Sequence, residues 1–139
     1  SSTDVQAYVQ AAVDAFGGVD VLFNNAGIEG VVSSLETYPE DDFDQVIAVN
    51  VKGVWLGMKH TADAMRQRGG GVIINTASVA GLRGTPGLIA YGASQHAVVG
   101  MTKSAAGGTG TRWDSGECRV PRPDRDSHDA LDRIGSSTR

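Results

Sequence analysis

The stretch that decides the fold is Val19-Asp20-Val21-Leu22-Phe23-Asn24-Asn25-Ala26-Gly27. An apolar run this short predicts a strand of a parallel sheet that is covered on both faces. The small and amide residues that follow allow a flat ligand to approach the backbone. Taken alone, Asn24–Gly27 is better interpreted as an ordinary polar turn after a strand.

Helical periodicity precedes this stretch. Apolar residues recur at three- and four-residue spacing from Val5 to Phe16, which predicts a helix with one buried face. Ser2 or Thr3 can cap its start, and Gly17 can end it. The chain is therefore expected to enter the strand from a helix.

The same order repeats after the polar turn. A second helix is expected from about Pro39 to Arg68, because proline and the acidic residues after it are favoured in a first helical turn. Gly69–Gly71 interrupts it, and Val72–Ile74 predicts a second buried strand that ends at the polar run Asn75–Ser78. A third helix is expected around Tyr91.

Alternating helices and strands place the chain in the α/β class. This order predicts a doubly wound parallel sheet of Rossmann type, in which ligands bind beyond the carboxyl ends of the strands. Residues 1–106 carry the pattern and are expected to form the folded unit. Residues 107–139 lose it and are expected to be a non-native or disordered tail.

Composition argues against several kinds of partner. A net charge of −4 offers no concentrated attraction for nucleic acid or anionic membranes. The single cysteine and the scattered histidines predict neither a disulfide nor a metal site. No apolar run approaches the roughly 20 residues that cross a bilayer. At 139 residues the chain is short for a dinucleotide-binding domain, so we expect a fragment. Because the sequence has neither a membrane-spanning run nor the pattern of a signal peptide, the expected compartment is the cytoplasm.

Four motifs in order give the chain a family resemblance. Asn24–Gly27 fits an Asn-Asn-Ala-Gly turn, Asn50 fits a helix asparagine, Ser78 fits a serine, and Tyr91 follows that serine by thirteen residues. These residues resemble the classical short-chain dehydrogenase/reductases. The resemblance implies NAD or NADP as cofactor and a small alcohol or ketone as substrate. It also implies a homo-oligomer at full length, because these folds commonly pair their long helices.

The resemblance implies a catalytic role for three residues. Tyr91 would be the acid/base on the substrate oxygen, Ser78 would hydrogen-bond that oxygen, and Asn50 would help hold a water-linked proton path. A phenol has an ordinary pKa of about 10, so it works at neutral pH only beside a cation. The plainer alternative is that these side chains merely satisfy buried polar groups.

Other residues would contact the cofactor. The resemblance implies that Asn25, Ala26 and Gly27 line it, and that Asn24 mainly ties neighbouring strands together beside it. Tyr91 and the residue four positions later would also reach the cofactor. That residue is Gln95, which stands where the family has lysine. Glutamine can hydrogen-bond a ribose hydroxyl, but it carries no charge to stabilise a phenolate.

A second departure concerns the cofactor phosphates. The family's Gly-x-x-x-Gly-x-Gly turn does not occur in the sequence and is expected to precede residue 1, within a first βαβ unit. We therefore expect a partial sheet that lacks this unit and the last strands. Together with Gln95, this predicts that the chain is inactive by itself.

The residues from Gly107 onward fit a shifted reading frame. Moved by one base, their codons can encode Val-Glu-Leu-Ala-Pro-Asp-Gly-Ile-Arg-Val-Asn-Ala-Val-Cys-Pro-Gly. That peptide resembles the family's next strand and its Pro-Gly cofactor loop, and it continues Lys103–Ala106 in register. We hypothesise a one-base frameshift at Gly107, with a genuine disordered tail as the alternative.

The sequence as a whole predicts an NAD(P)-dependent oxidoreductase that transfers a hydride between a nicotinamide and an alcohol or ketone. A non-catalytic homologue that binds a dinucleotide or acts as a scaffold is the alternative, and Gln95 favours it. A lyase or epimerase of the related extended fold is a further alternative, against which the Asn-Asn-Ala-Gly turn argues. The residues that choose a substrate are expected beyond the Pro-Gly loop, so no particular substrate is predicted.

Overall fold

Helix α1 (Ser2–Phe16) opens the fold. In the computed structural model, which describes residues 1–106 and 117–120, Ser1 caps this helix through a capping box. The predicted caps Ser2 and Thr3 lie inside the first turn instead, because Ser1 already bonds a free N–H group of that turn. Gly17 ends the helix with a φ of 76°, as predicted.

Two parallel strands follow the apolar runs. Strand β1 (Val21–Asn24) pairs in parallel with β2 (Gly71–Asn75), which places Asn24 beside Asn75 at their carboxyl ends. The α/β class with a parallel sheet is thereby confirmed. Strand β3 (Glu117–Val120) pairs antiparallel with the other edge of β2, which departs from the all-parallel prediction. An antiparallel strand can satisfy the same edge N–H and C=O groups as a parallel one.

One long helical stretch leads from β1 to β2. After a short turn, η1 (Leu35–Thr37), helix α2 (Glu40–Ile47) continues through the π-helical segment η2 (Ala48–Gly53) into α3 (Val54–Arg68). The predicted helix is therefore present, with an unpredicted π segment in its middle. Such segments occur frequently at functional sites, and η2 contains Asn50.

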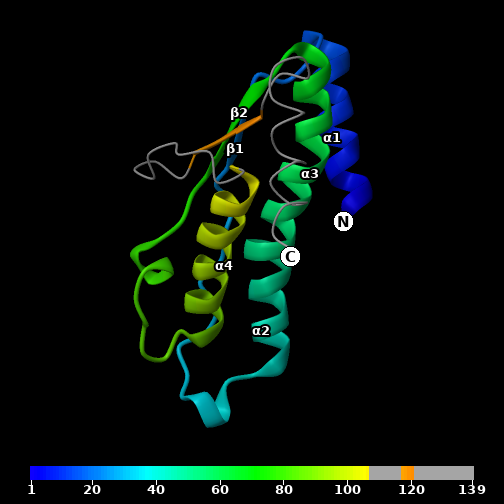
Figure 1. The fold of residues 1–139 in the computed structure, drawn as a ribbon. Helices are drawn as coiled ribbons and strands as arrows, with labels where there is room; N and C mark the ends of the chain where they lie inside the picture. The colour runs from blue at the N-terminus through cyan, green and yellow to red at the C-terminus, as the bar shows by residue number, and fades with distance from the viewer. Residues whose placement is uncertain (107–116, 121–139) are drawn as a thin grey trace, which may run out of the picture.

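Helix α4 completes the described fold. After β2, the turn η3 (Val79–Gly81) and a loop lead into α4 (Ile89–Ala105), which begins slightly earlier than the predicted start near Tyr91. Helix α3 lies between α1 and α4 (Figure 1). Ile28, in the loop after β1, bonds Asn50 of the π segment, and Asn50 in turn bonds Ser94 near the start of α4.

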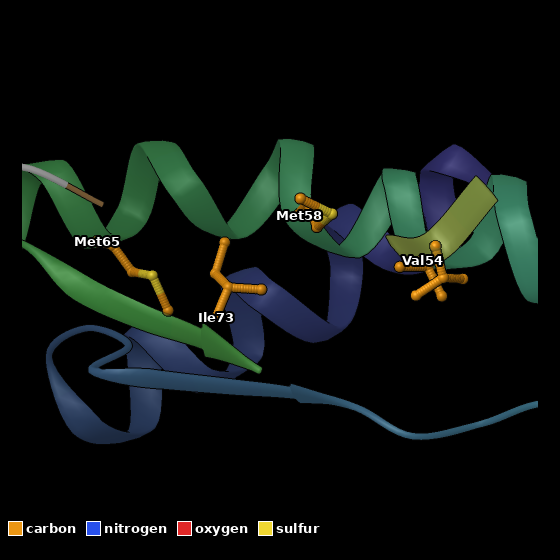
Figure 2. Packing of buried hydrophobic residues seen from close by; sticks show 5 residues of the cluster. Val54, Met58, Met65 and Ile73 are labelled. Carbon is orange, nitrogen blue, oxygen red and sulfur yellow. The ribbon is translucent and has the colours of Figure 1, made fainter. Parts of the chain in front are cut away.

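The hydrophobic core lies between these helices and β2. It consists of five buried side chains, Val54, Met58, Met65, Ile73 and Val98. Figure 2 shows Met65 of α3 and Ile73 of β2 pointing into the space between the helix and the strand.

The opposite face of β1 is open in the described part of the chain. Leu22 packs against the core, whereas Val21 is 57% exposed and Phe23 is 60% exposed. The prediction that both faces of this strand are buried is therefore wrong for the described residues. The reason is that the core helices pack on the Leu22 side alone.

Residues 107–139 lie outside the described part of the chain, except for the backbone of β3. Within that described part, no helix is both long and apolar enough to span a bilayer. The same residues contain no cluster of three or more potential metal ligands.

Candidate active site

A cavity of about 360 Å³ lies beyond the carboxyl ends of β1 and β2. Ligands of parallel α/β sheets bind at this edge. The residues that line the cavity are Asn25, Ala26, Gly27, Ile28, Glu29, Asn50, Val54, Thr76, Ala77, Tyr91, Gln95 and Val98. The predicted cofactor loop, the tyrosine, the glutamine and the helix asparagine therefore meet in one place.

Amide side chains join the carboxyl ends of β1 and β2. Asn24 Nδ2 donates a hydrogen bond to Asn75 Oδ1 at 2.8 Å. Asn75 Nδ2 in turn donates to Thr102 Oγ1 of α4 at 3.0 Å. Asn24 thus links neighbouring strands, as expected, and is not among the residues that line the cavity.

Asn50 holds the loop that follows β1. Its Oδ1 accepts a hydrogen bond from the Ile28 N–H at 2.9 Å, and its Nδ2 donates to the Ile28 carbonyl at 2.8 Å and to Ser94 Oγ at 3.0 Å. Gly27 lies against the same side chain, because a Cβ at residue 27 would be 3.3 Å from Asn50 Oδ1. Both amide hydrogens of Asn50 are therefore engaged in hydrogen bonds, and its Oδ1 accepts one.

Tyr91 and Gln95 lie one turn apart on α4, and both line the cavity. Tyr91 is half-buried and Gln95 is 7% exposed. Gln95 can donate and accept hydrogen bonds but has no charge. None of the described residues that line the cavity is basic, and the acidic one is Glu29. The position that carries lysine in the family pattern therefore brings no cation to this cavity.

Ser78 lies apart from this group. It precedes η3, and its Oγ accepts a hydrogen bond from the Ala80 N–H at 3.2 Å. It is half-buried and is not among the residues that line the cavity. The structure thus brings Tyr91, Gln95, Asn50 and Asn25–Gly27 together, and it leaves Ser78 and Asn24 outside the lining.

Three residues near the cavity carried no functional prediction. Thr76 Oγ1 donates to Asn25 Oδ1 at 2.8 Å, which joins the two loops that follow the strands. Ser94 is fully buried and bonds Asn50. The sequence offered a signal for both residues, because Thr76 lies in the polar run after β2 and Ser94 lies between Tyr91 and Gln95. Glu29 lines the cavity without any comparable signal.

Comparison with known proteins identifies the family. A protein-family model described as short chain dehydrogenase matches residues 1–112 of this chain. The chain belongs to the short chain dehydrogenase family. Levodione reductase of Leifsonia aquatica is 44% identical over 102 residues, which are 73% of this chain and 38% of the reductase. A crystal structure of levodione reductase matches with a TM-score of 0.75 and 42% identity, covering 79% of this chain and 43% of that one.

Two further short chain dehydrogenase relatives contain cofactors. The structure of NAD+-bound xylitol dehydrogenase matches with a TM-score of 0.74 and 40% identity, over 76% of this chain and 41% of that one. The structure of ElxO with NADP bound has a TM-score of 0.74 and 38% identity, over 76% and 43%. The predicted family resemblance is confirmed. The chain spans about two fifths of the length of these relatives.

Proposed function

We propose that the complete protein transfers a hydride between NAD or NADP and the carbon of a small alcohol or ketone. The cavity that joins Tyr91 and Gln95 to the loop Asn25–Gly27 carries this proposal. Hydride transfer at such a carbon requires a proton to move on the attached oxygen, and a phenol beside the cofactor can exchange that proton. Relatives whose structures contain NAD+ and NADP support this choice of cofactor.

The loop residues fit a flat cofactor ring. Asn25, Ala26 and Gly27 are exposed and line the cavity, and Asn50 holds the next residue in place. The nicotinamide would supply the hydride when bound. Gln95 would hydrogen-bond a ribose hydroxyl, and Tyr91 would hold the proton that the substrate oxygen exchanges. Ser78 would reach that oxygen from outside the lining described above.

This chain is proposed to be a poor catalyst by itself. The cavity has no basic lining residue among those described, so nothing there stabilises a phenolate by charge. The glycine-rich phosphate turn does not occur within residues 1–139 either. A non-catalytic protein that binds a dinucleotide or acts as a scaffold is the second candidate, and the neutral Gln95 in the catalytic turn favours it.

A chimera separates these candidates. Residues 1–106 replace the segment of levodione reductase that they match, so the reductase supplies a phosphate-binding segment and the later strands. Cofactor binding is measured by calorimetry, and hydride transfer by nicotinamide absorbance with a panel of alcohols and ketones. Turnover that Tyr91→Phe abolishes supports the oxidoreductase. Binding without turnover, even after Gln95→Lys, supports the non-catalytic candidate. Absence of both binding and turnover contradicts the oxidoreductase and the dinucleotide-binding protein, and it leaves the scaffold.

The partner and the location of the complete protein are proposals as well. We propose a homo-oligomer in the cytoplasm, formed through the long helices. The outer surface of α3 supports this, because Trp55 is 46% exposed there and Lys59 lies over its ring at 5.2 Å. Aromatic side chains are enriched in protein interfaces. A complete protein that runs as a monomer in size-exclusion chromatography would contradict it.

A further inference from the structure

Ser94 lies on the inner side of α4, between Tyr91 and Gln95 in the chain. It is fully buried. Its Oγ accepts a hydrogen bond from Asn50 Nδ2 at 3.0 Å and donates one to the Tyr91 carbonyl at 2.8 Å. One hydroxyl therefore connects the π segment to the turn of α4 that carries the tyrosine.

Asn50 extends this connection to the loop after β1. The side chain bonds both the N–H and the carbonyl of Ile28, which directly follows the predicted cofactor-lining residues. Asn50 is 2% exposed, so water hardly competes for these bonds. A continuous chain of hydrogen bonds thus runs from the loop through Asn50 and Ser94 to Tyr91.

A second buried hydroxyl holds α4 farther along the same face. Thr102 is 1% exposed, donates to the Val98 carbonyl at 2.7 Å and accepts from Asn75 Nδ2 at 3.0 Å. Residues 94, 98 and 102 recur every four positions, which places them on one face of a helix. Thr102 is eleven residues from Tyr91, or roughly 16 Å along a helix axis. It anchors the helix without touching the tyrosine turn.

We propose that Ser94 is a positioning residue that fixes Tyr91 relative to the loop that lines the cofactor. This inference rests on the proposed hydride-transfer function. Without the hydroxyl, Asn50 Nδ2 loses a partner in a buried place, and the tyrosine turn loses its tie to the Ile28 loop. A shift of about 1 Å between reacting groups can reduce a rate on the order of a hundredfold.

Three substitutions on α4 test the proposal in the chimera. Ser94→Ala removes the proposed tie. Thr102→Val removes a comparably buried hydroxyl far from the tyrosine. Ser104→Ala removes an exposed hydroxyl that bonds the Gly100 carbonyl at 2.9 Å. In the Gln95→Lys background, we expect Ser94→Ala to lower kcat by about tenfold or more. Thr102→Val and Ser104→Ala should leave kcat within about twofold, although Thr102→Val lowers the melting temperature.

A second measurement does not depend on turnover. In chimeras labelled with ¹³Cζ-tyrosine, the signal that disappears in Tyr91→Phe belongs to Tyr91. We expect Ser94→Ala to shift or broaden that signal and Thr102→Val to leave it unchanged. If Ser94→Ala does not fold, Ser94→Cys serves in its place, because a thiol fills the site with a somewhat larger atom and forms only weak hydrogen bonds.

The outcomes separate the two proposals. If Thr102→Val changes kcat and the Tyr91 signal as much as Ser94→Ala does, then Ser94 has only a structural role and the positioning proposal is overturned. An unchanged Tyr91 signal in Ser94→Ala overturns it equally. If no chimera transfers a hydride but the Tyr91 signal responds to Ser94→Ala alone, the proposed function fails and the positioning of Tyr91 stands.

Discussion

Gln95→Lys is the substitution that most directly tests how this cavity works. Gln95 is 7% exposed and lies one helical turn from Tyr91, so a lysine there would bring its ammonium into the same cavity. The described lining contains no basic residue that could play this part already. We expect the chimera with Gln95→Lys to transfer hydride at least about tenfold faster at neutral pH than the chimera with Gln95.

The size of this effect follows from the geometry. Residues one helical turn apart bring their side chains within about 5 to 6 Å. At that distance and an effective dielectric constant of about 20, a cation stabilises an anion by about 3 kcal/mol. Tyr91 is half-buried and the cavity is open to ligands, so water screens part of this interaction. Keeping about half of it leaves roughly 1.4 kcal/mol, which corresponds to a tenfold change in rate.

The assay is the pH dependence of alcohol oxidation. Any rise of the rate with pH should begin at lower pH with lysine than with Gln95, because the introduced ammonium favours a phenolate over a phenol. Lysine should also bind the cofactor more tightly, since an ammonium forms stronger hydrogen bonds to ribose hydroxyls than a neutral amide does. Tyr91→Phe is the control and should abolish turnover in both backgrounds. Equal rates and equal pH profiles for the two chimeras would show that the lysine role is supplied elsewhere.

Three further predictions concern packing, the gene and the isolated chain. Gly57→Ala should destabilise the chimera by about 1–3 kcal/mol in urea unfolding, because its Cβ would lie 2.6 Å from Asn24 Oδ1. Gly100→Ala, whose Cβ meets none of the described atoms within 4 Å, should be neutral or stabilising, and equal losses would contradict this reasoning. Resequencing the gene should reveal a one-base shift near the Gly107 codon, and a confirmed frame that encodes the present tail would refute that hypothesis. Residues 1–139 alone should aggregate or lack fixed packing, since Val21 and Phe23 are exposed and β1 pairs along one edge only among the described strands; a sharp cooperative melt in near-UV circular dichroism would overturn this.

Much of the fold could be predicted because its signals are local. Apolar runs located β1 and β2, and Gly17 and Gly69 end helices α1 and α3 in the left-handed conformation that glycine favours. The exposed face of β1 could not be predicted, since burial depends on which elements cover a strand. The direction of β3 depends on the path of the whole chain rather than on its four residues.

Most residues of the site could be predicted from the sequence, but the hydrogen bonds among them could not. Motif spacing led to Tyr91, Asn50 and the loop after β1, which share one cavity. Ser94 joins Asn50 across 44 positions of sequence, and no local pattern encodes such a pair. The place of Ser78 outside the lining likewise depends on how the turn η3 folds back, which its own sequence does not specify.

The π segment affects how side chains are oriented around the longest helical stretch described, from Glu40 to Arg68. Val46, Asn50 and Val54 are all buried and recur every four residues. In a regular α-helix with 3.6 residues per turn, each such step would rotate the side chain by about 40° beyond a full circle. The wider turns of η2 reduce this drift, so the three side chains lie closer to one line than the same four-residue spacing gives on a regular α-helix. Deleting one residue between Ala48 and Gly53 would leave seven steps from Val46 to Val54, about 20° short of two turns of a regular α-helix. Helices α2 and α3 would therefore keep their buried faces, whereas Asn50 would lose the wide turn in which it lies.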